Sequence, residues 1–373
     1  MKKETDTLTT FLTLLRSGLW EQSAGHFSFE MADLDTIYQI AEEQSIVGLI
    51  AAGLEQVEET KVPQSKMLPF LANVISLEQR NQEMDLFIGG IVEKMKEAAI
   101  YVVLVKGQGI AQCYERPLWR CCGDVDFLLE ESNYKRAKSF LLPLSSASGE
   151  EGNFSKHLAL TIDPWEVELH GTLRCGLSSK MDRVIDAIQR DTFSGNDFRV
   201  WNCGETKVYL PGPNNDIIFV FTHILKHFYK GGIGLRQICD WCRLLWTYRK
   251  DIDSSLLTCR LQEMGLTSEW KAFAAVAVDY LGMPVEAMPL HDSSARWSRK
   301  ANRIMAFIME VGNFGHNRDM SYYVKYPFLI RKAFSAGRRL VDLYRHAAIF
   351  PLDSLRFSPS ILKNGLRSAI KID

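Results

Sequence analysis

The first hundred residues place apolar side chains at the spacing of a helix. In the first twenty residues leucines recur three or four positions apart and share one side of a helix, at Leu8, Leu12, Leu15 and Leu19. A second helical pattern opens at Asp33, and a long third one runs from about residue 65 to residue 98. These patterns contain no group of catalytic residue types. They predict a helical scaffold or substrate wall over residues 1–99.

Between residues 100 and 212 the pattern changes to short apolar runs separated by turn residues. Four runs have the length and composition of strands, at residues 101–105, 120–129, 158–162 and 165–169. The stretch 131–142 has the apolar spacing of a helix. Strands mixed with helices over about a hundred residues predict a compact α+β unit with a small mixed sheet.

Helical spacing returns after residue 212 and persists to about residue 350. One helix is predicted around residues 217–228, with Asn214 or Asn215 as its N-cap, and another begins at residue 235 after a glycine-rich break. We therefore predict an α+β fold in which a nucleus of strands is flanked by helical N-terminal and C-terminal regions. The predicted regions are residues 1–99, 100–212 and 213–373.

Composition narrows the function without identifying it. The chain has 373 residues, of which 46% are hydrophobic and 24% charged, the balance of an ordinary globular protein. Its formal net charge of -1 argues against a general nucleic-acid binder, which needs a broad basic face to displace counterions. The apolar runs are too short to cross a bilayer, and the N-terminus lacks the apolar stretch of a signal peptide. We therefore expect a cytoplasmic protein.

The eight cysteines are expected to be reduced thiols in such a compartment. Only Cys239 and Cys242 have the spacing of a metal or redox pair. No second such pair accompanies them, and they lie within an apolar helical pattern. Buried thiols are favoured over a metal or redox site.

Two aspartates in a strand-like run indicate where chemistry could occur. Asp124 and Asp126 are two positions apart, so alternation along a strand places both on one face and Val125 on the other. Carboxylates this close repel each other, and a hard divalent cation such as Mg²⁺ relieves that repulsion. Gly123 leaves room for a ligand at the strand edge. An isolated pair of aspartates is more often a polar strand face, but apolar residues 127–129 indicate a mostly buried strand.

A third acid is available on the last predicted strand. Glu166, Glu168 and His170 alternate with apolar residues and therefore share one face. If this strand lies beside the Asp124 strand, one of the two glutamates completes a cage of three carboxylates. Such a cage can hold two metal ions about 4 Å apart, one to lower the pKa of an acceptor hydroxyl and one to bind a triphosphate. The spacing leaves the choice of glutamate open.

These residues belong to a series of short motifs that follow one another along the chain. The series is Leu104-Val-Lys-Gly107, Tyr114, Arg120-Cys-Cys-Gly-Asp-Val-Asp126, Lys156-His157, Val167-Glu-Leu-His170, Thr222-His223, Lys226-His227, and Leu235-Arg236 with Asp240. In combination it resembles the uncharacterised nucleotidyltransferase family of the DNA polymerase beta-like superfamily, over about residues 30–250. Superfamily members usually carry Gly-Ser where this chain has Lys106-Gly107, and the Lys-Gly form is the habit of this family.

The resemblance implies a reaction in which an acceptor hydroxyl attacks the α-phosphorus of a nucleoside triphosphate and expels pyrophosphate. It implies Mg²⁺ or Mn²⁺ bound by Asp124, Asp126 and Glu168, because the Glu-Leu-His motif supplies the third acid in that family. Such transfer depends on positioning and charge neutralisation, for which Lys106 and Arg120 are plausible anion clamps. The residues expected to bind the nucleotide are Lys106, Gly107, Arg120, Gly123, His170, Arg236 and Asp240.

The acceptor is not identified by these motifs. A small molecule, a sugar or a peptide fits the implied reaction, and nucleic acid is disfavoured by the net charge of -1. Two alternatives remain open. One is a catalytically degenerate member that binds a nucleotide or a partner protein, and the other is a scaffold without enzymatic activity.

Two residue pairs in the C-terminal region have both a plain and a functional interpretation. His223 and His227 have a spacing that can bind zinc, but core or pocket-lining histidines are favoured because no acid completes the motif. Arg236 and Asp240 are four positions apart, as in a local helix ion pair. The family resemblance suggests that they close the nucleotide or acceptor pocket.

The C-terminal tail is basic. Residues 331–373 contain nine Lys or Arg and three Asp, with apolar residues interleaved. One hypothesis is an amphipathic element that contacts an anionic membrane or a partner. A solvated helical face packed on the domain is favoured over it.

Overall fold

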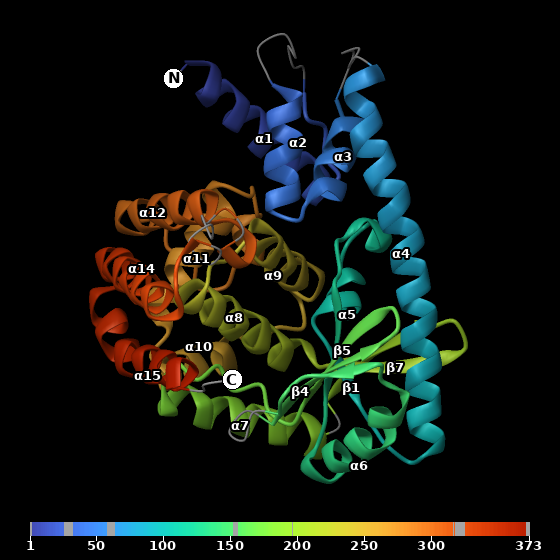
Figure 1. Ribbon diagram of the computed structural model, residues 1–373. Coiled ribbons are helices and arrows are strands. Elements are labelled where there is room, and N and C mark those ends of the chain that lie inside the picture. Colours follow the sequence, from blue (N-terminus) through green and yellow to red (C-terminus); the bar gives the residue numbers. More distant parts are fainter. Residues whose placement is uncertain are drawn as a thin grey trace.

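The computed structural model describes residues 2–25, 33–57, 64–151, 156–195, 197–315, 317 and 325–370. Its fold is α+β, with a small mixed five-stranded sheet. Helices precede and follow the strands along the chain, which confirms the predicted fold class. Figure 1 shows the N-terminal helices at one end of the molecule, the sheet at the other, and the C-terminal helices beside both.

Four helices form the N-terminal region, α1 (Lys2–Trp20), α2 (Leu34–Glu43), α3 (Val47–Glu55) and α4 (Gln64–Glu97). The helix α4 runs along one side of the molecule from the other three helices to the far end of the sheet (Figure 1). The helices α1 and α3 cross closely, because a Cβ atom at Gly18 would lie 1.9 Å from the Leu49 carbonyl oxygen.

That crossing determines which face of α1 is buried. The inward face is centred on Phe11, Leu14 and Leu15, beside Gly18, whereas Leu8 is 39% exposed. The leucine stripe predicted from the sequence is therefore wrong at its N-terminal end. The close contact with α3 orients the helix, and leucine spacing alone did not reveal it.

The sheet brings the two acidic strands together. It consists of β1 (Val103–Val105), β2 (Asp124–Leu128), β3 (Ala147–Ser148), β4 (His157–Ile162) and β5 (Trp165–His170), in the order β1-β2-β5-β4-β3. The strands β2 and β5 are parallel, and the other neighbours are antiparallel. The register pairs Asp126 with Glu168. The Asp124 strand and the Glu168 strand are therefore neighbours, as the three-carboxylate cage requires.

Short elements connect these strands. The helix α5 (Gly107–Ala111) and the turn η1 (Pro117–Trp119) join β1 to β2, and α6 (Glu131–Leu141) with η2 (Leu142–Leu144) follows β2. Residues 171–210, for which the sequence predicted no element, contain α7 (Ser179–Ser194) and the hairpin β6 (Phe198–Cys203)–β7 (Thr206–Pro211). The strand β7 packs against β1 and α4.

The C-terminal region is helical. Its elements are α8 (Pro213–Lys230), α9 (Leu235–Thr247), α10 (Ser254–Met264), α11 (Thr267–Asp279), η3 (Val285–Ala287), α12 (Ala295–Val311), η4 (Asn313–Gly315), α14 (Phe328–Ile349) and α15 (Pro351–Ile370). The helices α8 and α9 lie between the sheet and the outer helices (Figure 1). They form the wall that faces the carboxylates.

The predicted cap of α8 is wrong. Gly212 is the N-cap and Pro213 occupies the first helical position, where its fixed φ and missing N–H fit a helix start. Asn215 instead lies in the first turn, where its buried side chain donates to Thr192 Oγ1 at 3.0 Å.

The described residues form two hydrophobic cores. One joins α1–α3 to the C-terminal helices, with Phe11 and Phe221 among its members. The other joins α4, the sheet, α6 and the hairpin, with Ile88 and Phe127 among its members. These cores cross the predicted region boundaries at residues 99 and 212.

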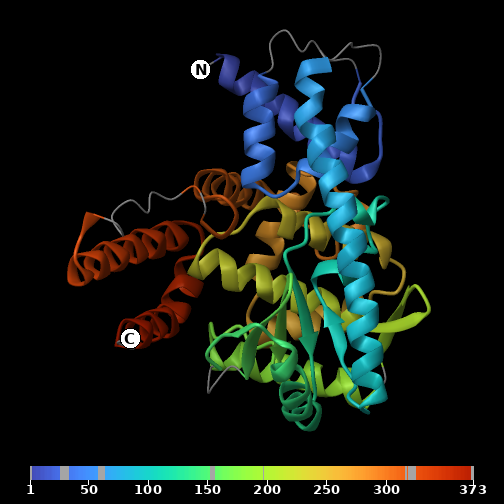
Figure 2. The ribbon, with the colours of Figure 1, turned by 45° about the vertical axis from the view of Figure 1, so that its right-hand side comes forward.

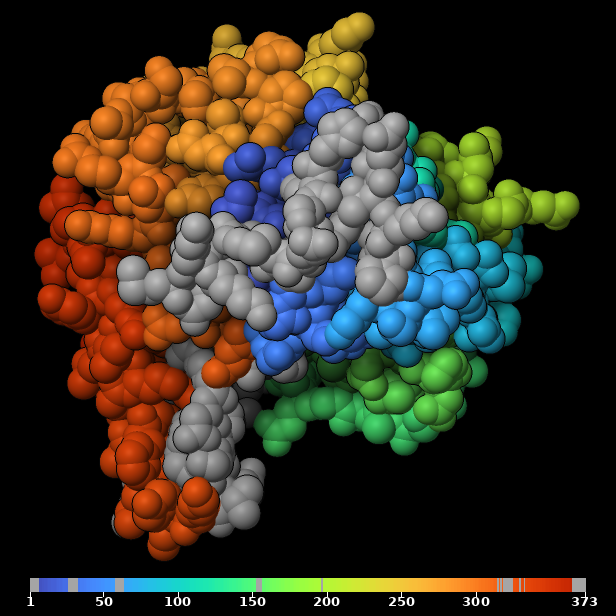
Figure 3. Space-filling view, turned by 90° about the horizontal axis from the view of Figure 1, so that it is seen from above, coloured from blue at the N-terminus to red at the C-terminus, as the bar shows by residue number. Residues whose placement is uncertain are grey.

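The basic tail forms α14 and α15, which extend away from the body of the molecule (Figures 2 and 3). Phe350 and Phe357 anchor them in the core, while Tyr344, Leu352 and Leu355 are 74–81% exposed. Residues 371–373 of the tail lie outside the described residues. None of the described helices combines the length and apolarity needed to cross a bilayer.

Candidate active site

Three carboxylates converge on the neighbouring inner strands β2 and β5 of the sheet. Oxygen atoms of Asp124, Asp126 and Glu168 all lie within 4.8 Å of one another. Glu166, the other candidate for the third acid, is exposed, and its Oε1 accepts a hydrogen bond from Thr161 Oγ1 at 2.8 Å. The geometry therefore favours Glu168 as the third acid.

Asp126 is the most buried of the three, and an ammonium and an imidazole group contact it. Its Oδ1 lies 2.7 Å from Lys106 Nζ and 2.6 Å from His170 Nε2. Burial alone would raise the pKa of Asp126, but Lys106 and His170 outweigh it and hold that pKa below its usual value. Burial also disfavours a charged His170, yet its bonds to Asp126 and Glu168 raise its pKa.

Asp124 is less well compensated. Burial, and next the charge of Asp126, raise its pKa above the usual value. Three carboxylates here face one ammonium group, that of Lys106. A cluster with this charge imbalance attracts a divalent cation.

The backbone at Lys106 is strained. Its φ of 59° and ψ of -148° fall in a region that side-chain-bearing residues rarely adopt, at a cost of about 1–3 kcal/mol. Gly107 follows with φ of +42°, and a Cβ there would lie 3.2 Å from Cys122 Sγ. This turn between β1 and α5 places the ammonium of Lys106 on Asp126.

A second buried cluster joins α9 to the segment before β2. Arg120 donates to both oxygens of Asp240, at 2.9 and 2.6 Å, and Tyr114 Oη donates to Asp240 Oδ1 at 2.8 Å. Burial disfavours the charged Arg120, but Asp240 outweighs it and raises the pKa of the guanidinium. The charge of Arg120 is thus matched within the protein.

The local Arg236–Asp240 ion pair considered from the sequence does not form. Asp240 binds Arg120, while Arg236 Nη1 donates to the Cys121 carbonyl oxygen at 2.7 Å. The Nε of Arg236 is buried and has no hydrogen-bond partner among the described residues.

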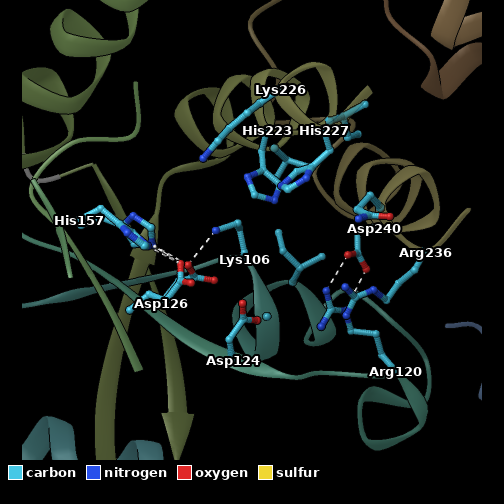
Figure 4. A pocket seen from close by; sticks show the side chains of 17 residues that line it. Lys106, Arg120, Asp124, Asp126, His157, His223, Lys226, His227, Arg236 and Asp240 are labelled. Atoms are coloured by element: carbon cyan, nitrogen blue, oxygen red, sulfur yellow. Dashed lines mark hydrogen bonds and ion pairs between the residues drawn. The ribbon is translucent and has the colours of Figure 1, made fainter. Parts of the chain in front are cut away.

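The helices α8 and α9 supply the opposite wall of the cavity (Figure 4). His223, Lys226 and His227 come from α8, and Arg236 comes from α9. Burial, and then the nearby lysines, lower the pKa of His223 well below its usual value and that of His227 to about 3. Both imidazoles are therefore neutral at neutral pH. Burial and Lys106 also lower the pKa of Lys226.

A comparison with models of protein families identifies the family of this chain. A model of the uncharacterised nucleotidyltransferase family matches residues 30–282, more than half of the chain. The chain belongs to this family. The match continues beyond residue 250, where the recognised motifs end, and includes α10 and α11. No curated protein and no solved structure matches the chain.

Nine of the ten site residues predicted for this nucleotidyltransferase family member line one cavity. They are Lys106, Gly107, Arg120, Asp124, Asp126, Glu168, His170, Arg236 and Asp240. The exception is Gly123, which does not line it and faces open space, since a Cβ added there would meet no atom within 4 Å. Open space beside Gly123 leaves room for a ligand, and its predicted role in binding the nucleotide stays a prediction.

Further residues of the cavity were missed as site residues. They are His157, His223, Lys226, His227 and Gln237. Four of them stand in the motifs that suggested the family, so the signal was present but no role was assigned to it. His223 and His227 line the cavity, as the sequence favoured, and among the described residues they belong to no metal-binding group.

The cysteine pair of the family member is buried in α9. Cys239 and Cys242 are both fully buried, and burial raises the pKa of each thiol. This environment suits unreactive thiols, in line with the interpretation favoured from the sequence.

Proposed function

We propose that this family member is a metal-dependent nucleotidyltransferase that transfers a nucleoside monophosphate from a triphosphate to an acceptor hydroxyl and releases pyrophosphate. The observation that supports it most is the convergence of Asp124, Asp126 and Glu168 in a cavity whose opposite wall bears Lys226 and Arg236. Negative charge for a cation and positive charge for phosphates face each other across one space.

The donor set fits a hard divalent cation. Carboxylate oxygens are the ligands that Mg²⁺ and Mn²⁺ prefer, and Asp124, Asp126 and Glu168 would hold the ion. When bound, the ion neutralises phosphate charge and lowers the pKa of the acceptor hydroxyl. Lys106 holds Asp126 in place through its 2.7 Å contact.

Lys226 and Arg236 are better placed than Arg120 to bind the triphosphate. Arg120 is occupied by Asp240, so a phosphate would have to displace a buried carboxylate. Arg236 has a buried Nε without a partner among the described residues, and the Lys226 ammonium points into the cavity (Figure 4). The role of Arg120 is then to fix α9 against β2 rather than to clamp phosphate.

Pyrophosphate release tests the proposal. The protein is incubated with Mg²⁺, each nucleoside triphosphate, and a panel of sugar, small-alcohol and peptide acceptors. Asp124→Asn is expected to lower release at least about 10²-fold, because it removes a carboxylate that would hold the ion neutralising the reacting phosphate. Glu166→Gln is the matched control and should retain the activity. Glu166 is exposed and stands two residues before Glu168 on the same strand.

Calorimetry separates the catalytic proposal from its alternative. Binding of a triphosphate with Mg²⁺ but without pyrophosphate release across the panel would support a catalytically degenerate, nucleotide-binding or protein-interaction member. The absence of heat with every triphosphate would contradict the catalytic proposal and the nucleotide-binding alternative, and would favour the protein-interaction alternative. Nucleic acid is the least favoured acceptor because of the net charge of -1.

Peripheral membrane contact through α14 and α15 is a separate proposal. It is supported by Tyr344, Leu352 and Leu355, which are large, apolar and 74–81% exposed on a basic arm. The fraction of protein that sediments with phosphatidylserine vesicles should fall when all three residues are changed to serine. Leu86→Ser, equally exposed at 78% but on α4, is the control, and equal binding by the triple variant would contradict the proposal.

A further inference from the structure

Two histidines lie beside the carboxylates, on the neighbouring strands β4 and β5. His157 of β4 and His170 of β5 are directly opposite each other in the antiparallel register, and their ring centroids are 4.9 Å apart. Both Nε2 atoms approach the same oxygen, Oε2 of Glu168, at 2.9 and 3.3 Å. Three donor atoms of types that bind metals therefore converge on one point beside the cavity.

The spacing of these atoms matches the ligands of a single ion. Donor atoms about 2.0–2.2 Å from one metal ion lie about 2.8–3.6 Å from one another in octahedral or tetrahedral geometry. The two His–Glu168 distances, 2.9 and 3.3 Å, fall at this value. Three protein ligands with a side open to a cavity are also the arrangement of metal sites that keep a position for a substrate.

A purely orienting role explains the histidines less well. His157 is 36% exposed and Glu168 is 28% exposed, so their ion pair is screened by water and contributes little. Orienting Glu168 would need one imidazole, whereas two converge on a single oxygen. Asp126, by contrast, is held by Lys106 and His170 and needs no contribution from His157.

We propose that His157, Glu168 and His170 form a second metal site, which binds a divalent first-row transition-metal ion in preference to Mg²⁺. Imidazole nitrogen suits Zn²⁺ and neighbouring ions such as Co²⁺, and Mn²⁺ accepts it beside carboxylates, whereas Mg²⁺ prefers oxygen ligands. Glu168 belongs to both groups of donor atoms, so its carboxylate bridges this site and the three-carboxylate site. Ions bridged in this way lie about 3.5–4 Å apart.

The site shares its cavity with the cationic side chains of Lys106, Lys226 and Arg236. A second divalent ion beside these cations would be favoured by the negative charge of a triphosphate. We therefore expect one ion to bind before nucleotide and the second to bind with it. Binding at His170 Nε2 also ends its bond to Asp126, which frees that carboxylate for the second ion.

Cobalt and manganese spectroscopy without nucleotide tests the site. Wild-type protein titrated with Co²⁺ should develop visible d–d absorption, and bound Mn²⁺ should show nitrogen hyperfine coupling from imidazole. His157→Ala should lose this absorption and weaken Co²⁺ binding by more than the about 10-fold typical of losing an outer-shell partner. Glu166→Gln, on the same strand face but engaged with Thr161, should bind as the wild type does.

The proposal is overturned if Co²⁺ does not bind, if Mn²⁺ shows no nitrogen coupling in the wild type, or if His157→Ala keeps the absorption and the affinity. The wild-type measurement stands whether or not the variant folds. Because no nucleotide is present, failure of nucleotidyl transfer with every acceptor would leave this site intact. Absence of nitrogen coupling with Asp124-dependent transfer retained would reject this site alone.

Discussion

Two buried charged clusters bound the cavity, and they differ in how their charges are matched. In the arginine cluster, formed by Tyr114, Arg120 and Asp240, one guanidinium meets one carboxylate through two hydrogen bonds, and both charged side chains are under 10% exposed. In the carboxylate cluster, formed by Asp124, Asp126 and Glu168 with Lys106, three negative charges meet one positive charge.

The difference separates a structural from a chemical role. A matched, fully hydrogen-bonded pair gains nothing from a ligand, and removing one partner leaves an uncompensated buried charge. In a cluster with excess negative charge the carboxylates repel one another. A bound cation or the loss of one charge lowers that repulsion. The same substitution should therefore have opposite effects on stability in the two clusters.

Replacing Asp by Asn in each cluster is the strongest test. Asp240→Asn should lower the free energy of unfolding by about 3–5 kcal/mol, because Arg120 is left buried and unpaired. Asp124→Asn should leave it unchanged or raise it by up to about 1 kcal/mol, because the pKa of Asp124 is raised by burial and Asp126. Urea denaturation in buffer containing a chelator measures both.

The triple variant Tyr114→Phe, Arg120→Met, Asp240→Leu provides the control for that comparison, because the Tyr114 hydroxyl would otherwise lose Asp240 as its acceptor. Apolar residues of similar size remove both charges at once, and replacing a buried pair in this way is often neutral. Stability near that of the wild type is expected. A loss under about 1 kcal/mol in Asp240→Asn alone would show that the arginine cluster is not the structural element we infer.

The carboxylate cluster was accessible from sequence and the arginine cluster was not. Alternation along a strand places Asp124 with Asp126 and Glu168 with His170 on one face each, whatever the rest of the fold does. Only the β2–β5 pairing had to be assumed. The partner of Asp240 lies 120 positions away, and helical spacing suggested Arg236 instead, because local spacing cannot show which distant element docks.

The same limit explains the other differences. The buried face of α1 depends on its crossing with α3 at Gly18. His157 is opposite His170 only once β4 and β5 pair. In each case the residue type was visible in the sequence, but its neighbours come from tertiary packing.

A third buried titratable group, Glu269 in α11, differs from both clusters because burial favours its neutral, protonated form. Burial, and then the nearby Asp353, raise the pKa of Glu269 to about 8 from 4.5, and its Oε2 has no partner among the described residues. The folded state therefore binds a proton that the unfolded state releases above pH 4.5. This group lowers stability progressively as pH rises from about 4.5 to 8, by up to about 5 kcal/mol.

Glu269→Gln should remove that pH dependence. The variant is expected to be more stable than the wild type by roughly 2 kcal/mol or more at pH 8 and nearly equal at pH 4.5, because the amide stays neutral throughout. Urea denaturation at both pH values measures the difference. An equal effect at the two values would show that Glu269 does not hold a proton in the folded protein.

The smallest expected effect concerns the wall that faces the carboxylate cluster. Arg236 is held by one bond to the Cys121 carbonyl oxygen, and its buried Nε lacks a partner among the described residues. Arg236→Gln should raise the KM for the triphosphate about 10-fold, the equivalent of about 1.4 kcal/mol, with little change in kcat or stability. Steady-state pyrophosphate release measures both constants.

Arg136→Gln is the matched control, because Arg136 also binds backbone carbonyl oxygens, those of Ala98 and Ala99, but lies away from the cavity. It should leave the KM unchanged. A fall in kcat at constant KM in Arg236→Gln would instead place the guanidinium on charge that develops only in the transition state. Arg236 would then act with the carboxylate cluster in catalysis rather than in binding the substrate.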